Sequence, residues 1–140
     1  MKFSRLFRFF RSKSDPPDDE APHLLLGKLG EKAALNHLKY EGYRIRALNY
    51  RTKRGEIDII AQDNNVIAFV EVRTLSSEDH GDALSTITHG KRSRLTRAAN
   101  HYIEKYKLRE MEWRFDFISV KIGSDKIPRL KLIRNAFPPA

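Results

Sequence analysis

The sequence predicts a single α/β domain in which a central mixed β-sheet is flanked by helices. Three observations lead to this prediction. A chain of 140 residues with 40% hydrophobic composition is long enough for one core and too short for two comfortable ones. Hydrophobic residues recur at helical spacing in two segments and follow strand patterns in five others. The order along the chain is α-β-β-β-α-β-β, which is typical of a mixed sheet covered by helices.

The first 22 residues are expected to lie outside this domain. Residues 1–14, MKFSRLFRFFRSKS, are a basic amphipathic arm. A disordered tail, a membrane-surface contact, a nucleic-acid contact and an organelle transit peptide all remain open for this arm. Residues 12–22 contain prolines and like charges that cannot pack in a core, so they are assigned to a linker. The folded domain is predicted to begin near His23 and to span residues 23–140.

A helix is predicted first, from Leu24 to Glu41, because Gly42 supplies a stop signal. One stripe of this helix is expected to face the sheet, and it consists of Gly27, Glu31, Ala34, Leu35 and Leu38.

Three strands are predicted next, as a meander: Tyr43–Asn49, Glu56–Gln62 and Ile67–Thr74. A basic loop, Tyr50–Arg54, joins the first two, and the turn Asp63–Val66 joins the second and third.

A second helix is predicted from Lys91 to Tyr106, after a polar loop. Its buried face is expected to consist of Leu95, Ala98, Ala99, Tyr102 and Tyr106. Two strands, Arg114–Lys121 and Arg129–Arg134, then close the domain.

The composition and net charge of the chain exclude several classes of function. The formal net charge is +9 and the isoelectric point is near 9.9, which indicates a polyanionic partner such as nucleic acid. The absence of cysteine excludes disulfides, thiolate zinc sites, iron–sulfur clusters and a cysteine nucleophile. Neither zinc nor an organic cofactor is expected, since no paired histidine ligands and no glycine-rich phosphate loop occur. With no apolar run approaching ~18 residues, a cytoplasmic protein is expected.

Acidic residues interrupt the two central strands where apolar residues are expected. If Asn64 and Asn65 form the two-residue loop of a type I′ hairpin, residues pair 63 with 66, 60 with 69, 58 with 71 and 56 with 73. Asp58 then lies opposite Glu71, and like charges in that position are destabilising unless they are neutralised. Carboxylate oxygens suit Mg²⁺ or Mn²⁺. Metal-dependent hydrolysis of a phosphodiester follows as a hypothesis.

Simpler interpretations stay open. The alternating charges are also typical of a solvated sheet face, on which Glu56 and Arg73 would form an ordinary cross-strand ion pair. A change of one residue in loop length would move Asp58 and Glu71 to opposite faces. Glu31 points toward the sheet if it belongs to the helical stripe, and it reaches solvent if it lies at the edge of the stripe.

Two basic clusters could follow a nucleic-acid backbone. Arg51, Lys53 and Arg54 lie in the loop that leads to Asp58. The second cluster, at the start of the second helix, consists of Lys91, Arg92 and Arg94, and a helix N-terminus also favours phosphate. A solvated basic surface is the alternative for each residue taken alone.

Three segments of the chain, GEKAALNHLKYEGYRIRALNYRTKRGEIDIIAQDNNVIAFVEVRT, ALSTITHGKRSRLTRAANHYI and RFDFISV, carry a resemblance that extends over roughly residues 24–121. In these segments the chain resembles the YraN-like family of largely uncharacterised bacterial proteins. The combination of GEIDII with FVEVR at this separation is more specific than either motif alone.

That family is similar to the restriction-endonuclease-like fold and to archaeal Holliday-junction resolvases. The resemblance implies a metal site formed by Glu31, Asp58 and Glu71, with Arg73 at the position of the lysine in the ExK motif. It further implies that the peptide carbonyl of Val72 is a metal ligand. Arginine stays protonated and cannot act as a general base, although it can hold a phosphate.

The leading hypothesis is therefore a Mg²⁺- or Mn²⁺-dependent nuclease that acts on DNA, with branched or damaged DNA among the candidate substrates. The alternative is a nucleic-acid-binding protein without catalysis, built on a nuclease scaffold. A peripheral membrane protein that uses the arm is the third class. Cleavage of a four-way junction would additionally require two sites in a homodimer.

Overall fold

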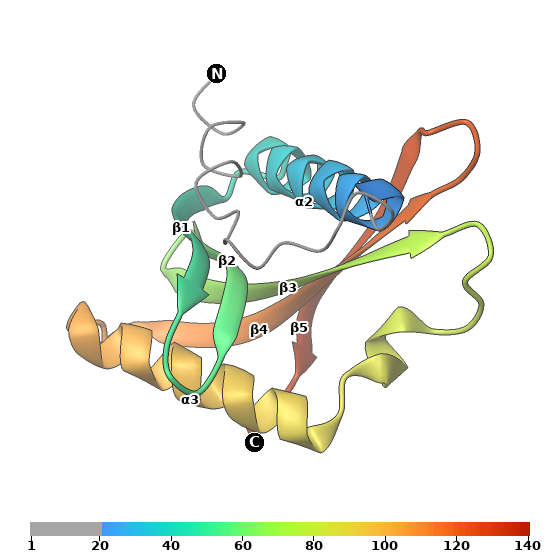
Figure 1. Ribbon diagram of the computed structural model, residues 1–140. Coiled ribbons are helices and arrows are strands. Elements are labelled where there is room, and N and C mark those ends of the chain that lie inside the picture. Colours follow the sequence, from blue (N-terminus) through green and yellow to red (C-terminus); the bar gives the residue numbers. More distant parts are fainter. Residues whose placement is uncertain (1–20) are drawn as a thin grey trace.

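The computed structural model describes residues 21–140 (Figure 1). The predicted order α-β-β-β-α-β-β is confirmed. The helices are α2 (Ala21–Tyr40) and α3 (His89–Lys105), and the strands are β1 (Arg44–Arg51), β2 (Glu56–Asp63), β3 (Val66–Ser76), β4 (Glu112–Ile122) and β5 (Pro128–Phe137). Because α2 begins at Ala21, its first two residues belong to the segment that was assigned to the linker. The predictions made for the basic arm lie outside the described residues.

The five strands form one mixed sheet in the order β1-β2-β3-β4-β5. β3 and β4 are parallel, and the other neighbours are antiparallel. The parallel pair is connected by a crossover that contains α3 and a short 3-10 helix, η2 (Ala83–Thr86), where the sequence predicted only a polar loop. α2 lies over one face of the sheet and α3 over the other (Figure 1). Neither helix of residues 21–140 is long and apolar enough to cross a membrane.

Each helix packs on its own hydrophobic core. The core between α3 and the sheet is aromatic, and Phe69, Phe115 and Phe117 lie at its centre with at most 1% exposure. The core between α2 and the sheet is mostly aliphatic. The predicted buried faces are confirmed for Ala34, Leu35, Leu38, Leu95, Ala98, Ala99 and Tyr102. The prediction is wrong for Tyr106, which lies just past the end of α3 and is 48% exposed.

The β2–β3 hairpin has the predicted register near its turn. Asp63 pairs with Val66 and Ile60 pairs with Phe69. The turn is not of type I′, because that type needs a positive φ at both central residues and only Asn64 has one, at 53°. The ladder ends with Ile59 opposite Val70. The pairs predicted beyond it, 58 with 71 and 56 with 73, are therefore not formed as ladder pairs.

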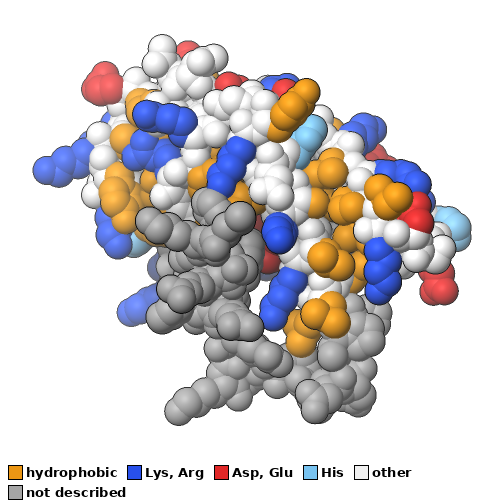
Figure 2. Space-filling model, turned by 90° about the horizontal axis from the view of Figure 1, so that it is seen from above, with side chains coloured by type: hydrophobic (Ala, Val, Ile, Leu, Met, Phe, Trp, Pro, Cys, Tyr) orange, Lys and Arg blue, Asp and Glu red, His pale blue; other side chains and the backbone are white. Residues whose placement is uncertain are grey.

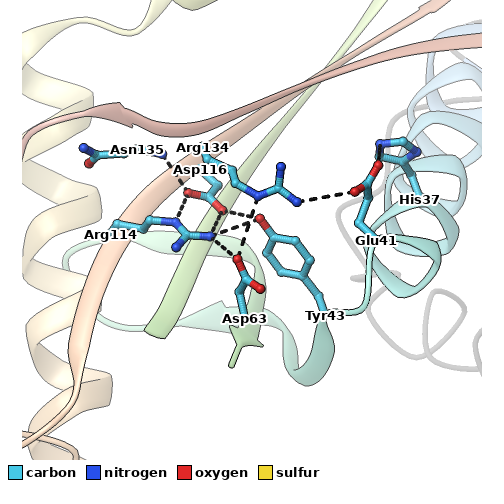
Figure 3. Close-up of polar contacts among 8 residues, drawn as sticks. All are labelled: His37, Glu41, Tyr43, Asp63, Arg114, Asp116, Arg134 and Asn135. Atoms are coloured by element: carbon cyan, nitrogen blue, oxygen red, sulfur yellow. Dashed lines mark hydrogen bonds and ion pairs between the residues drawn. The ribbon is translucent and has the colours of Figure 1, made fainter. Parts of the chain in front are cut away.

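A buried polar network closes the end of the sheet that contains the β2–β3 turn (Figure 3). Asp116 of β4 is fully buried and accepts hydrogen bonds from Tyr43 Oη at 2.8 Å, Arg114 Nε at 2.8 Å and the Asn135 N–H at 3.0 Å. Arg114 also donates to Asp63 at 2.7 Å. Burial and the charge of Asp116 raise the pKa of Tyr43 to about 12, so this hydroxyl stays protonated and donates. The network connects Tyr43, which directly precedes β1, with β2, β4 and β5.

Two glycines of α2 give a matched test of its packing on β3. A Cβ at Gly30 would overlap Thr74, with the side-chain Cγ2 only 2.8 Å away, whereas a Cβ at Gly27 would meet nothing within 4 Å. We expect Gly30→Ala to lower the free energy of unfolding by about 1–3 kcal/mol through overpacking. Gly27→Ala is expected to raise it by up to about 1 kcal/mol, since alanine favours helix. Urea denaturation measures both, and equal effects would contradict the packing described.

Candidate functional site

A pocket of about 300 Å³ lies where β2, β3 and the first turns of α3 meet. Its lining, called here the carboxylate pocket, consists of Glu31, Asn49, Gly55, Glu56, Asp58, Glu71, Lys91, Arg94 and Leu95. Three of the acidic residues singled out in the sequence, Glu31, Asp58 and Glu71, are thus brought to one place from α2, β2 and β3.

Asp58 lies just beyond the end of the β2–β3 ladder. Its Oδ2 accepts a hydrogen bond from the Val72 N–H at 2.9 Å, so a side chain takes the place of a backbone acceptor on the neighbouring strand. The pKa of Asp58 is raised well above its usual value, chiefly by burial and then by the negative charge of Glu71. The charge of Glu31 acts in the same direction, while the Val72 hydrogen bond and Lys91 oppose it.

Glu71 is held by a lysine from α3. Only 8% of Glu71 is exposed, and its Oε1 lies 2.5 Å from Lys91 Nζ. Lys91 is placed there because Thr88 caps α3 and accepts the Lys91 N–H at 3.1 Å, which fixes the first turn of the helix. Sequence reasoning assigned Lys91 to a nucleic-acid surface, and the structure places it among the carboxylates.

Glu31 completes the acidic lining from α2. Its pKa is raised, first by burial and then by the charge of Glu56, with Lys28 opposing the shift. Glu31 is half-buried, which agrees with neither a fully inward stripe residue nor a fully solvated one. It contributes negative potential to the pocket.

The donors of the pocket fit a hard divalent cation held by two carboxylates. Among residues 21–140, no three His, Asp or Glu side chains are close enough together to hold one metal ion. Mg²⁺ commonly uses only one or two protein carboxylates, with water and substrate phosphate oxygens as its other ligands. Asp58 and Glu71 could supply such a pair, because both line the pocket, and the charge of Glu71 adds to burial in raising the pKa of Asp58. Glu31 would lie beside a cation held by this pair, because it lines the same pocket.

Arg73 lies apart from the carboxylate pocket. Its guanidinium donates to Thr86 Oγ1 at 3.1 Å, and it lines a different pocket beside η2. Glu56 forms its ion pair with Arg51, at 3.4 Å, so the cross-strand pair between Glu56 and Arg73 is absent from the described residues. The role of the Val72 carbonyl as a metal ligand stays a prediction.

The predicted basic residues divide among three places. Arg51, Lys53 and Arg54 line a larger hollow of about 660 Å³ together with Thr52, Arg97 and His101. Arg94 lines the carboxylate pocket, next to Lys91. Arg92 lies elsewhere, with its guanidinium carbon 5.8 Å from the centre of the Phe137 ring.

Sequence reasoning missed Arg97 and His101, although a signal for them was present. The two residues lie one and two turns beyond Arg94 on α3 and are four apart, so they share one side of the helix.

The loop between β1 and β2 is packed against the backbone of α3. A Cβ on Gly55 would lie 2.5 Å from the Arg94 carbonyl oxygen, so only glycine permits this approach. The contact lies between the carboxylate pocket, which Gly55 and Arg94 line, and the hollow lined by Arg54 and Arg97. The two hollows are therefore neighbours along α3.

The comparisons with known proteins point to one family. The model of the uncharacterised protein family UPF0102 matches residues 30–120. A UPF0102 protein of Alkaliphilus metalliredigens is 45% identical over 112 residues, which is 80% of this chain and 96% of that protein. A relative from Symbiobacterium thermophilum is 42% identical over 80% of this chain and 95% of its own length. One from Legionella pneumophila is 40% identical, with 79% and 92% covered.

The raised pKa of Asp58 predicts a pH-dependent gain in stability for Asp58→Asn. A carboxyl group whose pKa is higher in the folded protein destabilises that protein increasingly as pH rises from the unfolded value, near 3.9, through the folded one. Asparagine carries no charge and still accepts the Val72 N–H. We expect the variant to match wild type near pH 4 and to be more stable at pH 7–8, in urea denaturation without added metal. A variant that is less stable than wild type at pH 8 would contradict the raised pKa of Asp58.

Proposed function

The chain belongs to the uncharacterised protein family UPF0102, and we propose that it is a metal-dependent nuclease that hydrolyses phosphodiester bonds in DNA. The observation that carries the proposal is the carboxylate pocket itself, in which Asp58, Glu71 and Lys91 meet beside a basic hollow. Lys and Arg side chains are spread over the face drawn in Figure 2. Residues 21–140 hold 22 basic and 14 acidic residues, so the folded part is suited to a polyanionic substrate.

Asp58 and Glu71 would hold a divalent cation, Mg²⁺ or Mn²⁺, through their carboxylate oxygens. When bound, such a cation lowers the pKa of a water molecule and polarises a phosphodiester. Asp58 is already fixed in position, because its other oxygen accepts the Val72 N–H. Glu31 adds negative potential at the edge of the same pocket.

Lys91 and Arg94 would bind the phosphate that reacts. Lys91 carries three donors on a flexible stem, and its side chain is 34% exposed. Its ammonium is already partly removed from water in the ion pair with Glu71. It can therefore move to a phosphate oxygen with little further loss of hydration. Arg94, one turn further along α3, lines the same pocket and offers a planar fork that suits a phosphate.

Lys91 rather than Arg73 would be the positively charged side chain beside Asp58 and Glu71. The resemblance to restriction-endonuclease-like enzymes assigns this role to the strand residue Arg73. Arg73, however, is hydrogen-bonded to Thr86 and lines the pocket beside η2. The 2.5 Å contact between Lys91 and Glu71 supports a helix lysine in the role of the strand lysine.

Two observations favour the second candidate, a nucleic-acid-binding protein without catalysis. Lys91 already neutralises Glu71, and no group of three metal-ligating side chains forms among the described residues. In this alternative the ion pair is structural and the basic surface carries the function.

A cleavage panel separates the two candidates. Purified full-length protein is mixed with linear duplex, single-stranded, flap and four-way-junction DNA, with Mg²⁺, Mn²⁺ or EDTA. We expect metal-dependent cleavage that is lost in Asp58→Ala while DNA binding in EDTA is retained. Binding without cleavage of any substrate would favour the non-catalytic candidate.

A matched pair of substitutions tests the role of Lys91. Lys91→Ala removes a cation that lies in the carboxylate pocket, and we expect its cleavage rate to fall by at least the ~10²-fold typical of one lost transition-state donor. Arg73→Ala removes a cation from the same strand as Glu71 but outside the pocket, so its rate should stay within a few-fold of wild type. Initial rates on the best substrate of the panel measure both. The reverse order of effects would return the role to Arg73.

A further inference from the structure

We infer that the hollow lined by Arg51, Thr52, Lys53, Arg54, Arg97 and His101, called here the basic hollow, binds one unstacked nucleotide of a single-stranded nucleic-acid segment. The inference rests on the proposed function and adds the substrate class. The strand whose phosphate reacts in the carboxylate pocket would be single-stranded where it passes the basic hollow.

The charge of the basic hollow is available to a ligand. Four of its six lining residues are cationic and none is acidic. Of the four, only Arg51 has a carboxylate partner among residues 21–140, namely Glu56. Lys53, Arg54 and Arg97 form no ion pair within this part of the chain. A polyanion can therefore bind them without first breaking an internal pair.

The volume of the basic hollow favours an unstacked base over a duplex. The phosphates of a duplex lie on its outside, so a cationic surface without a hollow is sufficient to contact them. A hollow of about 660 Å³ has room for a base as well as its phosphate. Arginine planes and the ring of His101 are groups on which bases stack, and the aliphatic stems of Lys53 and the arginines supply apolar walls.

The walls of the hollow are held in place on both sides. On the loop side, Thr52 Oγ1 accepts the N–H groups of Arg54 and Gly55, at 3.2 and 3.1 Å. On the α3 side, the Nδ1 of His101 lies 2.5 Å from Tyr50 Oη. A site that is ordered before binding loses less entropy when the ligand binds.

The distance along α3 between the carboxylate pocket and the basic hollow can be spanned by a few nucleotides of one nucleic-acid strand. Arg94 lines the carboxylate pocket and His101 the basic hollow, and seven residues of α-helix rise about 10 Å. Stacked nucleotides of one strand are spaced about 3.4 Å along the axis and unstacked ones lie further apart, so about three nucleotides or fewer cover this distance. A strand lying along α3 can thus occupy both hollows at once.

Fluorescence anisotropy in EDTA tests the inference without cleavage. A fluorescein-labelled oligothymidylate and a blunt duplex of equal length are titrated with the full chain at several salt concentrations. We expect tighter binding of the single strand. We also expect His101→Ala to weaken single-strand binding by about fivefold or more, the effect of losing one stacked base, with little change for the duplex. His101→Phe, which keeps a ring for stacking, should restore most of the affinity.

A second pair of variants controls for charge. Lys53→Ala should lower the slope of log affinity against log salt by about 0.7 on the single strand. Lys131→Ala removes another exposed lysine, on β5 and outside the basic hollow, and should leave the slope unchanged. Equal losses for single strand and duplex in His101→Ala, or equal slopes for the two lysine variants, would overturn the inference.

The two proposals fail separately. If the carboxylate pocket is not catalytic, no substrate of the panel is cleaved, yet the single-strand preference and its loss in His101→Ala remain. If the basic hollow has been assigned wrongly, cleavage still depends on Asp58 while His101→Ala binds single strands as wild type does.

Discussion

The site depends on one contact, the hydrogen bond from the Val72 N–H to the carboxylate of Asp58. The β2–β3 ladder ends at Ile59 and Val70, and beyond it a side chain satisfies the backbone of β3. An unpaired buried N–H costs about 1–3 kcal/mol, so the bond fixes the carboxylate beside Glu71 while β2 leaves the ladder. At this end of the hairpin, away from the β2–β3 turn, the first turn of α3 places Lys91 next to Glu71.

Two aspartates of the same sheet, Asp116 and the partly buried Asp58, differ in how many hydrogen-bond and charge partners they have. Asp116 is fully buried and has Tyr43, Arg114 and the Asn135 N–H as partners, so its charge is balanced within the fold. Asp58 has one backbone donor, and its pKa is raised first by burial and then by its two acidic neighbours, with Lys91 opposing the shift. An aspartate with a raised pKa lowers the stability of the folded protein at neutral pH. Such unfavourable arrangements of charged groups occur chiefly at functional sites. The contrast supports a ligand that supplies positive charge near Asp58.

Local pattern was sufficient for the elements and for part of the site. Periodicity predicted both helices and all five strands, and the two-residue loop at Asn64 and Asn65 set the register, although its turn type differs from the one assumed. The place of Lys91 could not be read from the sequence, because it depends on how α3 lies over β3. Periodicity also placed Tyr106 on the buried face, whereas α3 ends at Lys105 and leaves that side chain exposed.

The crossover between β3 and β4 decides which cation accompanies the carboxylates. Residues 77–88 lead from β3 to α3 and contain η2, which offers Thr86 as a partner to Arg73. The same segment ends in Thr88, the cap that fixes the turn carrying Lys91. Residues 77–88 thus provide both the partner that holds Arg73 outside the pocket and the cap that positions Lys91 inside it. The presence of arginine at position 73 therefore gives little information about the chemistry of this pocket. The length of residues 77–88 and the cap at Thr88 give more, because they determine where Lys91 lies.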